Sequence, residues 1–275
     1  MAHIMEKKEL APEIKRLVLS APEVAKKIKP GQFIILRCGE KGERFPLTVV
    51  EQDQEKGTLT IIFQEVGSST KRLGSLEDGE EVTDIVGPLG NPSEVKNFGT
   101  VVCIGGGVGT AVVYPVAKAL KAAGNRLVSI IGAKNKQLVI LEEQMREISD
   151  RLLVTTDDGS YGMHGFVTDA LEKLIADGLN IDRVVAVGPV VMMSAVCFIT
   201  KKEGIQTVVS LNPIMVDGTG MCGACRVTVA GQTRFACIDG PEFDGHQVDF
   251  EELLRRQRMY LEEEKIAMQR ENKDK

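Results

Sequence analysis

The chain has 275 residues, of which 43% are hydrophobic and 27% are charged, and its net charge is −5. This composition excludes a disordered, collagen-like or disulfide-scaffold protein, and it offers no basic surface for nucleic acid. No apolar run is long enough to span a membrane and the first residues lack the apolar core of a signal peptide, so we expect a cytoplasmic protein.

The first predicted unit is a small β-barrel over residues 1–97. Turn sequences such as Lys29-Pro30-Gly31 separate short runs that are rich in β-branched and apolar residues. These runs lie at 16–19, 32–37, 47–50 and 58–63. Their spacing predicts a small antiparallel barrel. Residues 1–5 resemble a cloning remnant and are given no weight.

Residues 98–210 have a different pattern, in which predicted strands alternate with predicted helices. Strands are predicted at 100–104, 126–131, 152–156 and 183–187, and helices at 111–123, 140–148 and 167–176. This alternation predicts an α/β domain with a doubly wound parallel sheet.

The last part of the chain is predicted to hold a small lobe and a helix. Residues 211–247 are rich in glycine and cysteine, and residues 248–275 form a charged helical pattern. Its apolar residues Phe250, Leu253, Leu254 and Leu261 fall near helical spacing. We expect this stripe to dock on a partner or on the α/β domain, the alternative being a solvated terminus.

A glycine-rich loop follows the first strand of the α/β domain and is a candidate nucleotide site. It consists of Gly105, Gly106, Gly107, Val108, Gly109 and Thr110. Glycines let the backbone approach a pyrophosphate, and the helix that follows offers free N–H groups. The alternative is a tight turn without a ligand, because the spacing departs from G-x-G-x-x-G.

Two further segments lie at the carboxyl ends of predicted strands, the edge at which open α/β sheets bind ligands. Asp157 and Asp158 are candidates to accept hydrogen bonds from ribose hydroxyls. Gly188 and Pro189 occupy the next such edge, where backbone can approach a nicotinamide. The alternative for each is an ordinary polar loop.

In the barrel, two segments are candidates to bind a flavin. Arg44 can clamp a pyrophosphate, and Thr48 follows Pro46 and Leu47 at a position suited to a flavin edge. The second segment is Gly67, Ser68, Ser69 and Thr70, which precedes a short helical pattern. A strand-end salt bridge and a helix cap are the alternatives.

The strongest motif is Asp217 followed by Cys222, Cys225 and Cys237. Plant-type [2Fe–2S] loops have the pattern C-x4-C-x2-C with a distant fourth cysteine, and this chain matches it with Asp217 in the first position. A carboxylate can ligate iron, so three cysteines and one aspartate are a plausible ligand set. A zinc site and inert core cysteines remain the alternatives.

Together these motifs resemble the ferredoxin–NADP reductase superfamily, and within it the electron-transfer subunits of dihydroorotate dehydrogenase B and of NADH-dependent reduced ferredoxin:NADP oxidoreductase. The resemblance implies FAD in the barrel, NAD(H) in the α/β domain and a [2Fe–2S] cluster in the lobe. The dihydroorotate subunits normally carry four cysteines. Three cysteines and one aspartate characterise the ferredoxin:NADP oxidoreductase subunit, so Asp217 favours that subunit.

The resemblance also implies a function in electron transfer. A nicotinamide passes hydride to the flavin, electrons then reach the cluster singly, and a larger iron–sulfur flavoprotein subunit exchanges them. No acid–base residue is required, and none is assigned. We expect NAD(H) to be preferred over NADP(H), although Lys134 and Lys136 argue partly against it. Outside this class, the alternative is a zinc-stabilised nucleotide-binding regulator.

Overall fold

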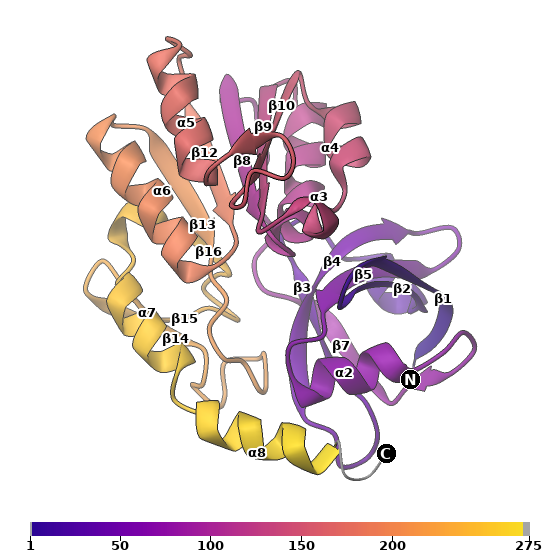
Figure 1. Ribbon diagram of the computed structural model, residues 1–275. Coiled ribbons are helices and arrows are strands. Elements are labelled where there is room, and N and C mark those ends of the chain that lie inside the picture. The colour runs from indigo at the N-terminus through magenta and orange to yellow at the C-terminus, as the bar shows by residue number, and fades with distance from the viewer. Residues whose placement is uncertain (1, 272–275) are drawn as a thin grey trace.

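A computed structural model of the chain describes residues 2–271. Its N-terminal part is a seven-stranded antiparallel sheet in the order β6-β1-β2-β5-β4-β3-β7, which curls into a nearly closed barrel (Figure 1). The strands are β1 (Ala2–Ala11), β2 (Ile14–Ser20), β3 (Phe33–Arg37), β4 (Arg44–Asp53), β5 (Thr58–Gln64), β6 (Glu81–Val82) and β7 (Asp84–Leu89). Two short helices, α1 (Pro22–Ala25) and α2 (Ser68–Ser75), accompany them.

The barrel closes around alternating apolar side chains. Leu17 and Leu19 of β2 lie opposite Ile61 and Leu59 of β5, and all four are fully buried. The low weight given to the first residues was wrong, because Ala2–Ala11 forms the whole of β1. Strand β1 pairs along the full length of β2, and its Ile4 is buried in the barrel core, so these residues belong to the fold.

The second sheet has the order β11-β10-β9-β8-β12-β13-β16. Its strands are β8 (Thr100–Gly106), β9 (Arg126–Ala133), β10 (Arg151–Thr156), β11 (Met163–His164), β12 (Arg183–Val187), β13 (Gln206–Ser210) and β16 (Glu242–Asp244). Its helices are α3 (Gly109–Ala122), η1 (Lys136–Leu138), α4 (Glu142–Ile148), α5 (Val167–Ala176) and α6 (Val190–Lys202). The predicted α/β elements end within two residues of the observed ones, and helix α6 was not predicted.

Helices cover both faces of this sheet, so each face has its own apolar core. One core gathers Val102, Val128 and Val184 with side chains of α5 and α6. The other holds Val101, Leu127 and α3 on the opposite face, and it also includes Ile14 and Ile62 of the barrel. This shared core fixes the barrel against the α/β domain.

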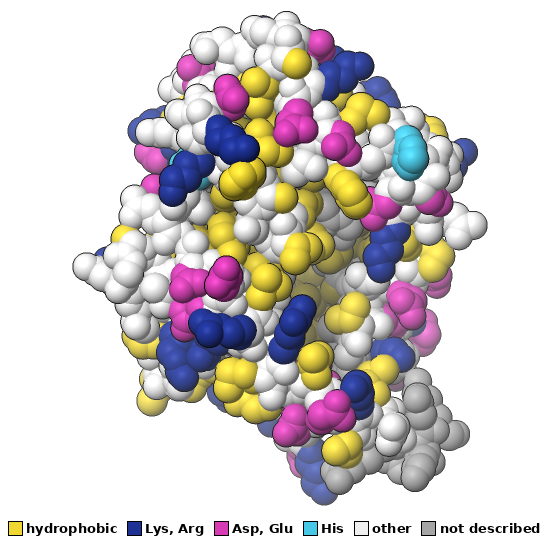
Figure 2. Space-filling view, turned by 60° about the vertical axis from the view of Figure 1, so that its left-hand side comes forward, with side chains coloured by type: hydrophobic (Ala, Val, Ile, Leu, Met, Phe, Trp, Pro, Cys, Tyr) yellow, Lys and Arg dark blue, Asp and Glu magenta, His cyan; other side chains and the backbone are white. Residues whose placement is uncertain are grey.

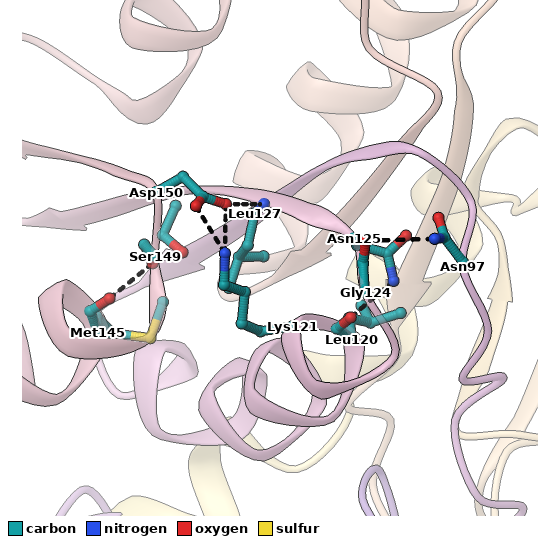
Figure 3. A network of polar contacts seen from close by, with 10 residues as sticks. Asn97, Leu120, Lys121, Gly124, Asn125, Leu127, Met145, Ser149 and Asp150 are labelled. Carbon is teal, nitrogen blue, oxygen red and sulfur yellow. Dashed lines mark hydrogen bonds and ion pairs between the residues drawn. The ribbon is translucent and has the colours of Figure 1, made fainter.

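A polar network anchors the end of α3 that lies away from the glycine-rich loop (Figure 3). Lys121 pairs with Asp150 at 2.6 Å, and the same carboxylate accepts a 2.7 Å hydrogen bond from the backbone of Leu127. Asn125 donates to the carbonyl of Leu120 at 2.7 Å and closes the helix. The C-terminal end of α3 is thus tied to β9 and β10, which keeps its N-terminal end in place.

The remaining chain forms a small lobe and two helices. The lobe contains the hairpin of β14 (Arg226–Val229) and β15 (Gln232–Phe235), the strand β16 and the turn η2 (Gly245–Gln247). Strand β16 pairs antiparallel with β13, so the predicted lobe contributes an edge strand to the α/β sheet. The prediction of a single C-terminal helix over 248–275 was wrong, because this segment forms two separate helices, α7 (Phe250–Gln257) and α8 (Leu261–Glu271). Residues 272–275 lie outside the described part.

Helix α7 packs on the chain's own α/β domain. Leu253 is buried in the core beneath α6, and Phe250 and Leu254 pack against that core. Leu261 does not continue the stripe, since it is 45% exposed on α8, which reaches across to α2 of the barrel (Figure 1). The C-terminal segment therefore connects the two domains.

Candidate functional site

The first half of β4 carries the predicted flavin residues on the surface of the barrel. Arg44 is exposed and Pro46, Leu47 and Thr48 are half-buried, whereas the next two residues of the strand are buried. Strand β4 is held by β3, where Pro46 faces Ile35 in the antiparallel ladder. Arg44, Pro46 and Thr48 share one face of the strand, whereas Leu47 packs against the barrel core from the other face.

The second flavin segment lies beside the first. Gly67 precedes α2, and the Oγ1 atom of Thr70 accepts a 3.1 Å hydrogen bond from the backbone N–H of Gly67. The Thr70 hydroxyl thus caps the helix, while Ser68 and Ser69 remain half-buried at its N-terminus. Ser69 donates a hydrogen bond of 3.4 Å to Glu43, the residue before Arg44, so the two segments meet.

The glycine-rich loop lies where the strand order of the α/β sheet reverses. From β8 the chain proceeds to β9 and β10 on one side and then crosses to β12 and β13 on the other. Such a reversal opens a crevice between the carboxyl ends of two strands, here β8 and β12. The loop at 105–110 follows β8 and Gly188 with Pro189 follows β12, so the two predicted segments flank this crevice.

Close packing requires three of the loop glycines. A Cβ atom on Gly109 would lie 2.4 Å from the carbonyl oxygen of Val187, and one on Gly105 would lie 2.6 Å from the Cα of Thr110. A Cβ on Gly106 would lie 2.4 Å from the sulfur of Met192. Glycine therefore lets α3 start directly against β12.

Met192, which follows Gly188 and Pro189 at the same sheet edge, lies in this crevice. Its Cε atom would also meet a Cβ added to Gly188, at 2.7 Å, so the thioether lies between the two glycine turns. The tip of the loop is different, because Gly107 has φ +56° and no atom would approach an added Cβ within 4 Å. The open tip leaves space for a ligand at the start of α3.

Asp157 and Asp158 lie at the carboxyl end of β10, two strands from the glycine-rich loop. Their backbone N–H groups donate to the carbonyls of Ala133 and Lys134, at 3.0 and 3.2 Å. Both side chains are exposed. The hydroxyl and backbone of Ser160 lower the pKa of Asp158. The pair thus forms the far end of the same sheet edge.

The four predicted metal ligands lie in one loop system of the lobe. The sulfur atoms of Cys225 and Cys237 are 3.1 Å apart and buried. Cys222 is exposed, and the backbone N–H groups of Ala224 and Asp217 lower the pKa of its thiol. Burial and the adjacent Cys225 thiol raise the pKa of Cys237.

Asp217 is held in its ionised form by the same loop. The hydroxyl and backbone N–H of Thr219 donate to its carboxylate and lower its pKa, and the backbone N–H of Met221 and the charge of Arg44 add to this effect. Arg44 belongs to the predicted flavin segment. The cluster loop itself lies against the barrel, because a Cβ added to Gly218 would lie 2.8 Å from the side chain of Ile35 in β3.

The donor set fits a two-iron cluster by its chemistry and its spacing along the chain. Within the described residues, no three His, Cys, Asp or Glu side chains converge on one point as a metal ion requires. Cys225 and Cys237 form a close buried pair, whereas Cys222 is exposed and Asp217 is half-buried in the same loop system. Asp217, Cys222, Cys225 and Cys237 would hold a [2Fe–2S] cluster, because their spacing follows the C-x4-C-x2-C pattern with a distant fourth ligand.

The buried cysteine pair packs against the barrel. Cys225 and Cys237 share an apolar cluster with Phe33 and Ile35 of β3, and Met215 completes it. Ile35 is also the ladder partner of Pro46 in the flavin segment. One strand therefore separates the predicted flavin residues from the predicted cluster ligands.

A groove of about 520 Å³ lies away from these sites, between α5, α6 and α7. Val191, Phe198 and Leu254 are among the residues that line it, and none of the predicted site residues does so. Figure 2 shows hydrophobic side chains running down the middle of the face on which α6 and α7 lie.

Among the described residues, no helix is both long and apolar enough to cross a membrane.

Comparison with known proteins agrees with this arrangement. Residues 212–249 match the family model for the iron–sulfur cluster binding domain of dihydroorotate dehydrogenase B. A Thermotoga maritima homologue of the electron-transfer subunit of dihydroorotate dehydrogenase B (NAD(+)) is 50% identical, covering 97% of this chain and 94% of that protein. The Bacillus cereus electron-transfer subunit is 33% identical, with coverage of 87% and 94%.

The fold has a counterpart among solved structures. A chain of the NADH-dependent reduced ferredoxin-NADP oxidoreductase structure, described for flavin-based electron bifurcation, superposes with a TM-score of 0.93 and 49% identity. The match covers 98% of this chain and 97% of that one. These similarities confirm the predicted fold class and the predicted cofactors FAD, NAD(H) and an iron–sulfur cluster. The chain therefore belongs to the family of dihydroorotate dehydrogenase B electron-transfer subunits and their homologues, flavin-dependent oxidoreductase subunits with a ferredoxin reductase-like fold.

Proposed function

We propose that this chain is the electron-transfer subunit that links NAD(H) to a larger iron–sulfur flavoprotein subunit through FAD and a [2Fe–2S] cluster. One observation carries the proposal: Ile35 pairs with Pro46 on one neighbouring segment and packs with Cys225 and Cys237 on another. Adjacent strands lie about 5 Å apart, so the flavin segment and the cluster loop are close enough to form one route.

Each site residue has a role in this route. Arg44 and the N-terminus of α2 bind the flavin pyrophosphate, and Thr48, Leu47 and Pro46 support its edge. The loop at 105–110 binds the nicotinamide nucleotide at the start of α3. Asp157 and Asp158 accept hydrogen bonds from its ribose, and Gly188 with Pro189 admits the nicotinamide.

When bound, the cofactors supply the redox chemistry: the nicotinamide gives hydride, the flavin takes two electrons, and the cluster moves them singly. The protein would hold these groups in place, the nucleotide at the crevice between β8 and β12 and the flavin on the first half of β4. The cluster loop holds its iron through Asp217 and the three cysteines. No side chain needs to donate or abstract a proton for hydride transfer.

Two partner enzymes fit this role. Asp217 in place of the first cysteine favours NADH-dependent reduced ferredoxin:NADP oxidoreductase. The similarity to dihydroorotate dehydrogenase B subunits supports that enzyme as the second candidate. The similarity of residues 212–249 to an iron–sulfur cluster binding domain disfavours a zinc-stabilised regulator. A cytoplasmic location remains a prediction of the sequence.

We propose that the partner contacts the exposed edge of the cluster loop. Met221 is 87% exposed next to Cys222, and Val216 and Ile238 are also exposed on this loop system. An apolar rim around an exposed ligand suits a subunit interface through which electrons leave. Met221→Lys should reduce co-purification with the larger subunit, whereas Met259→Lys, at a methionine exposed beyond α7, should not.

Analysis of the anaerobically purified chain tests the proposed function. We expect one FAD and two irons with two sulfides per chain, and bleaching of the flavin on addition of NADH. A colourless protein that contains zinc and no flavin would contradict the proposal. Co-purification from the native organism then distinguishes the two partner enzymes by whether the complex oxidises dihydroorotate.

A further inference from the structure

Helix α7 contacts the turn that carries the cluster ligands. Arg256 lies one helical turn beyond the buried Leu253, and its Nη2 donates a 3.0 Å hydrogen bond to the carbonyl oxygen of Ala224. Ala224 lies between the ligands Cys222 and Cys225. The apolar face of α7 is anchored in the core of the α/β domain, so this contact ties the turn to a rigid element.

The next residue of α7 holds the beginning of the lobe. The Nε2 atom of Gln257 donates to the backbone carbonyl of Asn212 at 2.8 Å and lies 3.1 Å from its side-chain oxygen. Arg256 and Gln257 therefore fix two points of the cluster-binding segment from one helix end. The C-terminal helix thus belongs to the structure of the electron-transfer site.

A second arginine supports the same turn. The Nη1 atom of Arg226 donates a 3.2 Å hydrogen bond to the carbonyl of Gly223. The N–H at the other end of that peptide unit, on Ala224, lies 3.5 Å from the sulfur of Cys222. A cation on the carbonyl polarises the peptide and strengthens the donor that faces the sulfur.

Arg256 also has an unused donor. Its Nε–H is buried and, among the described residues, has no hydrogen-bond acceptor. The ion pairs found in the described part of the chain do not include Arg256. Burying part of a guanidinium without a counter-charge costs free energy. The ionised ligands of the cluster loop would supply negative charge nearby and reduce this cost.

We propose that Arg256 is a positioning residue of the [2Fe–2S] site, which fixes the Cys222–Cys225 turn and raises the reduction potential of the cluster by its charge. The inference rests on the proposed function, because it requires the cluster. Reduction adds negative charge to the cluster, and a nearby cation favours the reduced form. The effect on the potential distinguishes this role from simple packing.

Redox titration of the holoprotein, followed by EPR, tests the proposal. Arg256→Met removes the charge and keeps most of the length of the side chain, and Arg256→Lys restores the charge. Arg255→Met is the matched control, since Arg255 is exposed on the same helix. We expect Arg256→Met to shift the one-electron equilibrium about tenfold towards the oxidised cluster, which is about 59 mV. Arg256→Lys should recover most of this shift, and Arg255→Met should change the equilibrium less than about twofold.

The outcomes separate the possible failures. An unchanged potential in Arg256→Met overturns the inference, as does a shift that Arg256→Lys does not recover. Loss of the cluster in Arg256→Met with retention in Arg256→Lys supports it, whereas loss in both overturns the role of the charge. The rate at which NADH reduces the flavin should be the same in all variants. If the unaltered chain binds no iron or sulfide, the proposed function itself fails.

Discussion

Ile35 faces Pro46 across the ladder between β3 and β4, and the same side chain packs against Cys225 and Cys237 of the lobe. The barrel and the lobe thus share strand β3 as a common wall. Because both neighbours of Ile35 belong to predicted cofactor sites, the position of the cluster relative to the flavin depends on ordinary core packing. The following predictions test parts of this arrangement.

Asp217 is predicted to ligate one iron of the cluster. Asp217→Cys should keep a [2Fe–2S] cluster with a changed reduction potential and changed EPR g-values, because a soft thiolate replaces a harder oxygen donor. Asp217→Ala should lose or destabilise the cluster, which iron analysis and visible absorption would detect. If both variants keep the spectrum and the potential of the unaltered protein, Asp217 is not a ligand.

Gly109→Ala should weaken both folding and nucleotide binding. The added Cβ would lie 2.4 Å from the carbonyl oxygen of Val187 and would push α3 away from β12. We expect a loss of about 1–3 kcal/mol in the free energy of unfolding, measured with urea, and a higher KM for NADH. Lys118→Ala, on the exposed face of the same helix, should change stability by less than about 0.5 kcal/mol. Equal effects of the two substitutions would contradict the packing argument.

Glu242 is predicted to make stability depend on pH. Glu242 is half-buried where β16 meets the linker between the domains, and Ser93 donates a 2.6 Å hydrogen bond to its carboxyl. Burial raises its pKa, an effect that Ser93 and the charge of Arg183 reduce without reversing. The native state therefore prefers the protonated form, and stability is lost as the pH rises above the carboxyl's pKa in the unfolded chain.

Glu242→Gln removes this pH-dependent cost and keeps an oxygen acceptor for Ser93. The free energy of unfolding of the variant, relative to the unaltered protein, should thus be higher near pH 7 than near about pH 4. Glu94→Gln is the control of opposite sign, since the hydrogen bond from Lys96 lowers the pKa of Glu94. A Glu242→Gln difference that is independent of pH would show that the carboxyl is not destabilised by burial.

NADH is predicted to be a better substrate than NADPH. The exposed carboxylates of Asp157 and Asp158 at the end of β10 should repel a 2′-phosphate. Lys136, which argues partly against this preference, has its ammonium 5.3 Å from the ring centre of Tyr161. Asp158→Asn should reduce the preference for NADH, measured as the kcat/KM for NADH divided by that for NADPH, by about fivefold. Asp177→Asn, at the far end of α5, should leave this ratio unchanged. A higher kcat/KM for NADPH in the unaltered protein would contradict the prediction.

The sequence predicted the α/β domain well because its signals are local. Buried parallel strands such as 100–106 are continuous apolar runs, and Gly105 to Thr110 mark the following turn. The same is true of the cluster loop, where spacing along the chain alone indicates the ligand set. In these parts, a short stretch of sequence is enough to predict the local structure or the ligand set.

What the sequence did not predict depends on contacts between distant segments. Strand β1 was missed because its middle is polar, and it gains its ladder only when β2 and β6 lie on either side of it. Helix α6 is apolar on several sides, so its periodicity is weak. The contact of Arg256 with Ala224 joins residues 32 positions apart, and no motif connects them. Charged side chains on a terminal helix are usually solvated, so the sequence offered no reason to assign Arg256 a contact with the cluster-binding turn.

Anaerobic rapid mixing of the purified chain with NADH, monitored by flavin absorbance and freeze-quench EPR, tests the central claim most directly. The account predicts that flavin bleaching is followed by the signal of a reduced [2Fe–2S] cluster within the same chain, without any partner. It also predicts that both signals disappear when NADH is omitted. Complete flavin reduction with no cluster signal, in protein shown to contain iron and sulfide, would contradict the route from NADH through the flavin to the cluster across β3.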